Sequence, residues 1–198
     1  MIYYSVPYTN DKNIGKYYNS FVDLLPNDED WACFIDADTI FLTPNYGHLI
    51  EEAIKNNTNF SVFTCFTNRI GNPKQSVHNL DMKLNYEEYE QYRKIYNGDK
   101  IDEHRKIAKE IQDKYGSKVI DMDEFLSKTY GDALLSGVMI MAQKKTIKDT
   151  PFKEEGMLGV DNSFHKDLQA KGLKIGLMKG LYIYHWHRGG KNTTHHLI

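Results

Sequence analysis

Cysteine is scarce in this 198-residue chain, which contains only Cys33 and Cys65. Neither belongs to a Cys-x-x-Cys pair, so a cysteine-based zinc site is excluded and a disulfide framework is not expected. Both lie inside apolar, strand-like runs, where a cysteine commonly serves as a small buried apolar side chain. This usage fits a reducing compartment.

Long apolar runs and a basic excess are also missing. No run approaches the roughly 20 apolar residues that a membrane-spanning helix needs, so we expect no integral membrane segment. The first ten residues lack the basic and then apolar layout of a signal peptide, and we therefore expect a cytoplasmic protein. The formal net charge is -2, with acids and lysines interspersed. A nucleic-acid-binding domain more often carries a basic stripe, so we expect no nucleic-acid partner.

The chain shows no internal repeat, low-complexity stretch or linker rich in Pro or Gly, so we expect one domain over residues 1–198. Helical spacing of apolar residues predicts helices over residues 14–25, 46–55 and 161–170. Runs typical of strands occupy residues 2–6, 31–35, 60–66, 134–142, 173–177 and 181–185. The alternation of strands and helices indicates an α/β/α sandwich around a mixed, mostly parallel sheet.

A strongly charged stretch extends from about residue 75 to about residue 128. Its apolar residues have helical spacing, and we interpret it as a helical insertion between elements of the sheet. An acceptor site would be expected here by position, although nothing in the composition identifies the acceptor.

Two carboxylates, Asp36 and Asp38, directly follow the apolar run over residues 31–35. Such a run is typical of a strand buried on both faces of a parallel sheet, and ligands bind at the carboxyl ends of these strands. Because side chains alternate with a period of two, Asp36 and Asp38 point to the same side. They can share one divalent cation, or divide the cation and a ribose hydroxyl between them. The alternative is a pair of aspartates that only cap the strand end.

Asp161 lies at the predicted start of the helix over residues 161–170, which Gly172 terminates. An aspartate at this position can serve as the N-cap by accepting a hydrogen bond from a backbone N–H. A carboxylate here can also act as a catalytic base that takes the proton from an attacking hydroxyl. Position alone favours the N-cap role.

Two histidines, His185 and His187, follow each other at the end of the last predicted strand, and strand alternation places both on one face. Imidazole is a good ligand for ions of the Mn²⁺ class, so one of them can join Asp38 at a shared metal. Arg188 can neutralise a diphosphate. The alternative is an aromatic strand end with solvated histidines.

Several short motifs follow one another along most of the chain. They are Val6-Pro7-Tyr8-Thr9-Asn10, Asn13-Ile14-Gly15 with Asn19 in the following helix, Asp36-Ala37-Asp38, Ser136-Gly137, Gly159-Val160-Asp161 with the helix ending at Gly172, and the strand that carries His185 or His187. In order and spacing, these motifs resemble the family 2 glycosyltransferases of the GT-A fold. The resemblance implies a GT-A-type nucleotide-sugar-binding sandwich.

The resemblance also implies a reaction, in which a sugar moves with inversion from a UDP- or GDP-linked donor to an unidentified hydroxyl acceptor. Asp38 is then a direct ligand of Mn²⁺ or Mg²⁺, and Asp36 contacts the ribose or a metal-bound water. Asp161 is the general base, and the metal offsets charge on the leaving diphosphate. The implied donor-binding positions are Pro7, Tyr8, Asn10, Gly15, Asn19, Asp36 and Arg188.

Two features depart from the family pattern. The segment between the first strand and the Asn-x-Gly stretch, which in the family carries the residue that reads the nucleobase, is missing. The base motif reads Val160-Asp161-Asn162 in place of Glu-Asp. The missing segment motivates one alternative, a degenerate relative that binds a nucleotide sugar or glycan without turnover.

A second alternative is a metal-dependent phosphatase of the haloacid-dehalogenase type. Its nucleophile motif is also Asp-x-Asp after an apolar strand, with Thr or Val two residues after the second aspartate. This chain has Ile40 at that position and shows no convincing later pair of acids.

Overall fold

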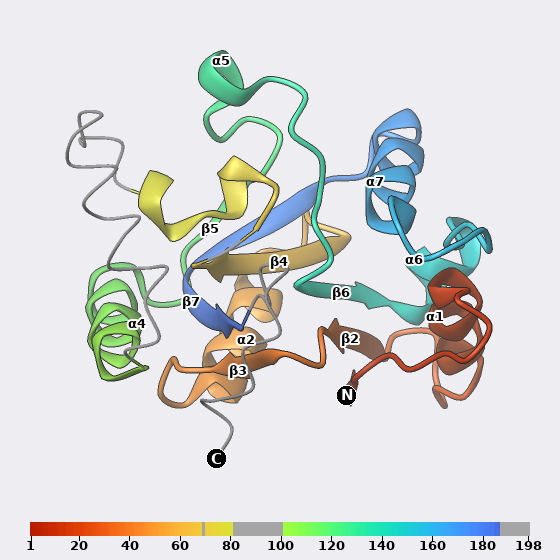
Figure 1. Cartoon of the computed structure of the whole chain (residues 1–198), viewed down its shortest axis with the longest axis horizontal. Helices are drawn as coiled ribbons and strands as arrows, with labels where there is room; N and C mark the ends of the chain where they lie inside the picture. The colour runs from red at the N-terminus through yellow and green to blue at the C-terminus, as the bar shows by residue number, and fades with distance from the viewer. Residues whose placement is uncertain (69, 81–100, 187–198) are drawn as a thin grey trace.

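The computed structural model describes residues 1–68, 70–80 and 101–186. In chain order, its elements (Figure 1) are β1 (Ile2–Ser5), α1 (Ile14–Asp23), β2 (Trp31–Ile35), β3 (Thr39–Phe41), α2 (Tyr46–Asn56), β4 (Val62–Thr67), η1 (Pro73–Gln75), η2 (Val77–Asn79), α4 (Ile101–Tyr115), β5 (Val119–Asp121), α5 (Ser127–Tyr130), β6 (Met139–Gln143), α6 (Lys144–Asp149), α7 (Val160–Ala170) and β7 (Ile175–His185). Predicted elements that are confirmed to within two residues at each end lie over residues 2–6, 14–25, 31–35, 46–55, 60–66 and 161–170.

The seven strands of the described residues form one sheet in the order β1-β2-β6-β4-β7-β3, and β5 pairs with β7 beside this path. The pairs β1–β2 and β4–β7 are parallel, whereas β2–β6, β4–β6, β3–β7 and β5–β7 are antiparallel. The α/β class and the mixed sheet are confirmed, but most of the strand pairs are antiparallel, so the predicted predominance of parallel pairing is wrong. Parallel neighbours need a crossover connection. The chain instead enters β6 at the edge of the sheet where β2 ends, since Met139, the first residue of β6, lies opposite Ile35, the last residue of β2. Strand β6 therefore runs antiparallel to β2.

Four strands, β1, β2, β4 and β7, run in the same direction. The edge of the sheet at which these four strands end is called the carboxyl edge below. In open α/β sheets, ligands bind outside this edge.

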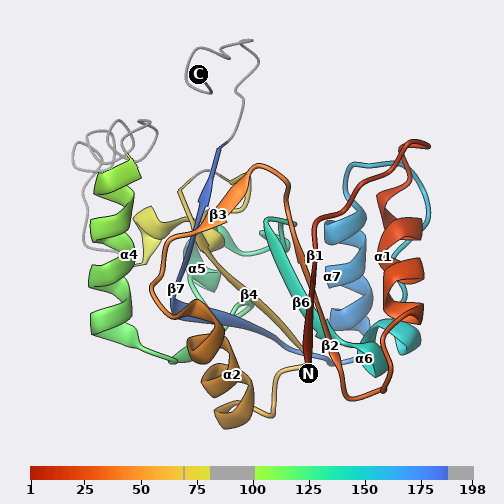
Figure 2. The same cartoon turned by 90° about the horizontal axis from the view of Figure 1, so that it is seen from below.

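Helices pack on both faces of the sheet, because α1, α4 and α7 contribute to one core cluster and α2 contributes to the other. In Figure 2, α1 and α7 lie side by side next to β6, and α4 lies at the other side of the strands, next to β7. Along strand β2, alternate side chains point to opposite faces of the sheet. Ala32 and Phe34 belong to the core under α1, while Trp31 and Cys33 belong to the core under α2. Cys33 and Cys65 are both buried and form no disulfide, as predicted. Among the described helices, none combines the length and apolar character that crossing a membrane requires.

Strand β7 is longer than predicted, because the two strands expected over residues 173–177 and 181–185 are one strand. Its pairing with β4 shifts register between Cys65, which lies opposite Met178, and Phe66, which lies opposite Tyr182. Gly180 lies inside this irregularity, where an added Cβ would come within 2.1 Å of the Gly116 carbonyl oxygen. The shift inverts the alternation of side chains, so Tyr182 joins the core under α1 instead of the core under α2.

The charged stretch over residues 75–128 contributes both a helix and a strand. Helix α4 buries Ala108 and Ile111 in the core beside β7. Strand β5 then pairs with β7, with Ile120 opposite Leu177. This stretch therefore widens the sheet, which the prediction of a helical insertion did not include.

Candidate functional site

Three of the predicted metal ligands meet at the carboxyl edge. Asp36 follows β2, Asp38 precedes β3, and His185 ends β7, where it lies opposite Thr39 of β3. One ligand atom from each of the three side chains lies within 4.8 Å of the others, and His185 Nε2 is 3.3 Å from Asp38 Oδ1. Two carboxylates and an imidazole are a suitable donor set for a divalent cation such as Mn²⁺. Metal binding itself stays a prediction.

The turn that carries the two aspartates is fixed by hydrogen bonds to its backbone. The Thr39 N–H and hydroxyl both donate to the Asp36 carbonyl, at 3.2 Å and 2.6 Å. The Asp36 N–H donates to the Val138 carbonyl at 3.3 Å, and the Trp186 N–H donates to the Asp38 carbonyl at 2.7 Å. These bonds attach the turn to the start of β6 and the end of β7, so the protein itself positions both carboxylates.

Asn68, which directly follows β4, holds the backbone of His185. Its Oδ1 accepts from the His185 N–H at 2.7 Å, and its Nδ2 donates to the His185 carbonyl at 3.2 Å. Sequence reasoning did not identify Asn68. The available signal was a polar side chain that follows the continuous apolar strand β4 at the same edge as Asp36.

We expect Asn68→Ala to weaken Mn²⁺ binding by about 10- to 100-fold, the usual effect of removing a group that orients a metal ligand. Calorimetric titration with Mn²⁺ measures this effect. Asn57→Ala is the matched control, because Asn57 also donates a side-chain hydrogen bond to a backbone carbonyl, that of Ala53, at the end of α2. Equal Mn²⁺ affinity in the two variants would contradict the assigned role of Asn68.

Negative charge is concentrated around Asp36. Burial raises the pKa of Asp36 to about 6; His185 opposes this rise, whereas the charges of Asp38 and Asp161 add to it. Burial also raises the pKa of Tyr18, and the charges of Asp36 and Asp161 raise it further. A bound cation would offset this repulsion between carboxylates.

The raised pKa of Asp36 predicts opposite effects of pH on the metal-free and metal-bound protein. In the metal-free protein, the folded state favours protonated Asp36, so the stabilisation from this group is lost as pH rises from its ordinary pKa of 3.8 to about 6. Metal binding requires the ionised form, so Mn²⁺ affinity should fall by up to about tenfold per pH unit below that value. The increase in melting temperature produced by Mn²⁺ should therefore grow between pH 5 and pH 7. An increase independent of pH would contradict this prediction.

Asp161 lies in the first turn of α7, but it is not the N-cap. That position belongs to Gly159, which has a positive φ of 77°. The Asp161 carboxylate instead accepts hydrogen bonds from the backbone N–H groups of Asn162 and Gly137, which lower its pKa, while burial has the larger effect and raises it. An added Cβ at Gly137 would lie only 3.4 Å from Asp161 Oδ2. The carboxylate is thus close to the backbone and in a defined orientation.

The segment before Gly137 is held by side chains from other elements. The Leu135 N–H donates to His165 Nδ1 at 2.9 Å, and Asn162 Nδ2 donates to the Leu135 carbonyl at 2.8 Å. The Ser136 N–H donates to Gln75 Oε1 at 2.8 Å, and Gln75 Nε2 donates to the Ser136 carbonyl at 3.1 Å. Gln75 and His165 are fully buried. Both were missed from the sequence, since their partners lie about 60 and 30 positions away.

His165 is itself oriented by Asp123. Because His165 Nδ1 accepts a hydrogen bond, the proton of a neutral ring lies on Nε2, which is 2.9 Å from Asp123 Oδ1. The close contact with His165 lowers the pKa of Asp123. The buried Lys74 donates from Nζ to the Asp123 carbonyl at 3.1 Å. Asp123 and Lys74 therefore lie behind His165, which holds the segment next to Asp161.

A cavity of about 490 Å³ lies next to Asp161. Its polar lining consists of Asn72, Asp132, Ser136, Asp161 and Asn162. Among the described residues that line it, none is a lysine or arginine. Carboxylate, amide and hydroxyl groups of this kind can hydrogen-bond the hydroxyl groups of a ligand.

The predicted donor-binding residues of the N-terminal motifs lie after β1, which also ends at the carboxyl edge. Pro7, Tyr8 and Asn10 belong to the loop between β1 and α1, and the Tyr8 side chain is 74% exposed. At Gly15, an added Cβ would lie 2.0 Å from the Lys153 carbonyl oxygen, so this glycine allows close packing of α1. Nucleotide binding by these residues stays a prediction.

Asn19 joins α1 to the segment that leads to α7. Its Oδ1 accepts from the Phe152 N–H at 3.0 Å, and its Nδ2 donates to the Phe152 carbonyl at 2.9 Å and to Glu154 Oε1 at 3.0 Å. These bonds give Asn19 a structural role, and its predicted contact with a donor stays a prediction. His187 and Arg188 lie outside the described residues.

The sequence was also compared with known proteins. No family model and no curated protein matches this chain. The arrangement of side chains at the carboxyl edge therefore supplies the argument for function.

Proposed function

We propose that this protein is a metal-dependent glycosyltransferase that moves a sugar from a nucleotide-diphosphate sugar to a hydroxyl acceptor. The observation that carries the proposal is the convergence of Asp36, Asp38 and His185 within 4.8 Å on a site where the charge of Asp161 also acts on Asp36. A cation site and a positioned carboxylate beside a polar cavity are the parts that such a transfer requires.

In this proposal, Asp36, Asp38 and His185 would hold the cation, and a bound cation would supply electrostatic stabilisation for the charge on the leaving diphosphate. Asp161 accepts the proton of the acceptor hydroxyl as that oxygen attacks the sugar carbon. Its raised pKa makes it a stronger base than an exposed aspartate. One base and direct attack by the acceptor correspond to transfer with inversion.

The two alternatives lack comparable support. A phosphatase of the haloacid-dehalogenase type has Thr or Val two residues after the second aspartate, whereas this chain has Ile40 there. A relative that only binds would not need a carboxylate whose orientation is set by the Gly137 and Asn162 N–H groups.

The test is an assay of UDP- and GDP-linked sugars with a panel of hydroxylated acceptors, with Mn²⁺ and with EDTA. We expect release of the nucleoside diphosphate, coupled to glycosylation of an acceptor and abolished by EDTA. Metal-dependent binding of UDP or GDP without transfer to any acceptor would favour the binding-only relative. Release of inorganic phosphate from a phosphomonoester would favour the phosphatase.

A further inference from the structure

Exposed apolar side chains gather around the first strand. Among the large apolar residues of the described chain, Met1 is 80% exposed, Tyr4 41%, Val6 50% and Tyr8 74%. The first ten residues contain no charged side chain. Edge strands in soluble proteins commonly carry lysine or another charge that prevents pairing with a second chain. Strand β1 lacks this protection.

The backbone of β1 has a free side. Within the described part of the chain, β1 pairs with β2 alone, and the Trp31 N–H donates to the Met1 carbonyl at 2.8 Å. In a parallel ladder, every second residue bonds the same neighbour. Met1 and Tyr3 therefore face β2, while the N–H and C=O groups of Ile2 and Tyr4 point away from it.

We propose that β1 pairs with β1 of a second copy of this chain, antiparallel and across a two-fold axis at Tyr3. In this register, Ile2 of each copy exchanges N–H···O=C bonds with Tyr4 of the other. Both residues lie within β1, and the side chains form two cross-strand pairs of an aromatic with a β-branched residue, which stabilise antiparallel sheets. Self-pairing places no charged side chain of this segment against its copy, and the charged residues that line the neighbouring groove, Glu51 and Lys55, belong to α2.

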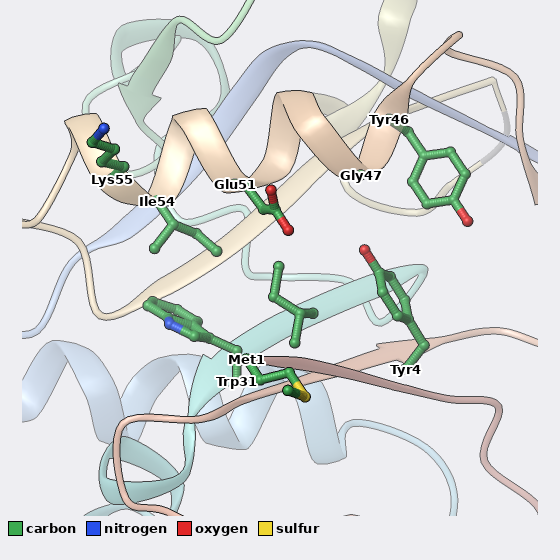
Figure 3. Close-up of a pocket in the computed structure, with 9 residues that line it drawn as sticks. Met1, Tyr4, Trp31, Tyr46, Gly47, Glu51, Ile54 and Lys55 are labelled. Atoms are coloured by element: carbon green, nitrogen blue, oxygen red, sulfur yellow. The ribbon is translucent and has the colours of Figure 1, made fainter.

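A groove beside β1 supports the same partner. It has a volume of about 490 Å³ and lies between α2 and the first two strands, with Ile2, Tyr4 and Trp31 on the strand side. Figure 3 shows Tyr4 reaching from its strand toward α2, while the amino end of Lys55 points away from the groove. The Tyr4 ring makes edge contacts with Phe41 and Tyr46, at centroid distances of 6.3 Å. A second β1 strand beside the first would extend the strand side of this groove with its own Ile2 and Tyr4 side chains.

The first experiment is sedimentation of the full chain over a range of micromolar concentrations. We expect a species of twice the 23.1 kDa chain mass, and we expect Tyr4→Lys to weaken the dimer at least about tenfold by placing a charge on each edge. Leu158→Lys is the control, because Leu158 is a 95% exposed apolar residue outside β1. A monomeric wild type, or a dimer weakened by Leu158→Lys and not by Tyr4→Lys, would overturn the proposal.

A cross-link tests the register without weakening the strand pair. Tyr3 of each copy would form a non-hydrogen-bonded pair with Cα atoms about 4.5 Å apart, which falls within the range for a disulfide. Tyr3→Cys should therefore give a covalent dimer on oxidation, and the buried native cysteines should give none in the wild type. Leu158→Cys serves as the exposed control. Cross-linking no greater at Tyr3→Cys than at Leu158→Cys would exclude this register.

Discussion

Asp161→Asn is expected to lower the rate of sugar transfer by about 100- to 10,000-fold, the usual contribution of a general base. Asparagine has the size of aspartate, and its carbonyl oxygen can still accept the hydrogen bond that the Asn162 N–H donates at 2.9 Å. It cannot take the proton of an attacking hydroxyl at neutral pH. Donor and Mn²⁺ binding should remain, so the loss should appear in kcat and not in the affinity for the donor.

Two measurements separate this effect from general damage to the protein. Calorimetric titration with the nucleotide in the presence of Mn²⁺ reports the donor site, and the transfer assay reports chemistry. Asp167→Asn, a change of the same kind six residues along α7, should leave both unchanged. Normal transfer by Asp161→Asn would show that the base lies elsewhere.

Asp38→Ala is expected to reduce Mn²⁺ affinity by more than about 100-fold, since removing a direct ligand should exceed the loss caused by removing a group that orients one. Binding of UDP or GDP that depends on Mn²⁺ should disappear with it. The charge of Asp38 raises the pKa of Asp36. Its removal should therefore lower the pKa of Asp36 and leave the metal-free protein at least as stable as the wild type near pH 7.

The combination of lost metal binding and retained stability is the decisive result for Asp38→Ala. Thermal unfolding without metal measures stability, and titration with Mn²⁺ alone measures the site. Asp102→Ala is a suitable control, because Asp102 pairs with Arg105 on the exposed surface of α4. Unchanged Mn²⁺ affinity in Asp38→Ala would exclude the proposed cation site.

The residues of the candidate metal centre could be predicted because their signals are local. Asp36 and Asp38 follow a continuous apolar strand, and His185 ends another. The residues that position them could not be predicted in this way. Asn68 acts on His185 from a distance of 117 positions, and Gln75 acts on the segment before β6 from 61 positions. Nothing in the neighbourhood of either residue specifies these partners.

In the fold as well, elements with local causes could be predicted from the sequence, and features that depend on distant contacts could not. Helices α1, α2 and α7 are set by apolar periodicity, and their ends were predicted within two residues. Strands β3 and β5, of three residues each, are too short to show a period. Lys179-Gly180 reads as a break in the sequence, yet it lies inside β7, because the glycine accommodates the approach of the Gly116 carbonyl. Strand direction leaves no periodic signal, so the antiparallel course of β6 could not be predicted.

The way in which residues 135–137 are held has a consequence for redesign of the cavity. The hydrogen bonds described for Ser136 engage its backbone N–H and carbonyl, both through Gln75, while the residue also lines the cavity. Backbone geometry at this position is thus dictated by a side chain from another part of the chain. Position 136 can therefore accept different side chains while the main-chain path beside Asp161 stays the same. It is the natural place to begin a library that alters ligand choice.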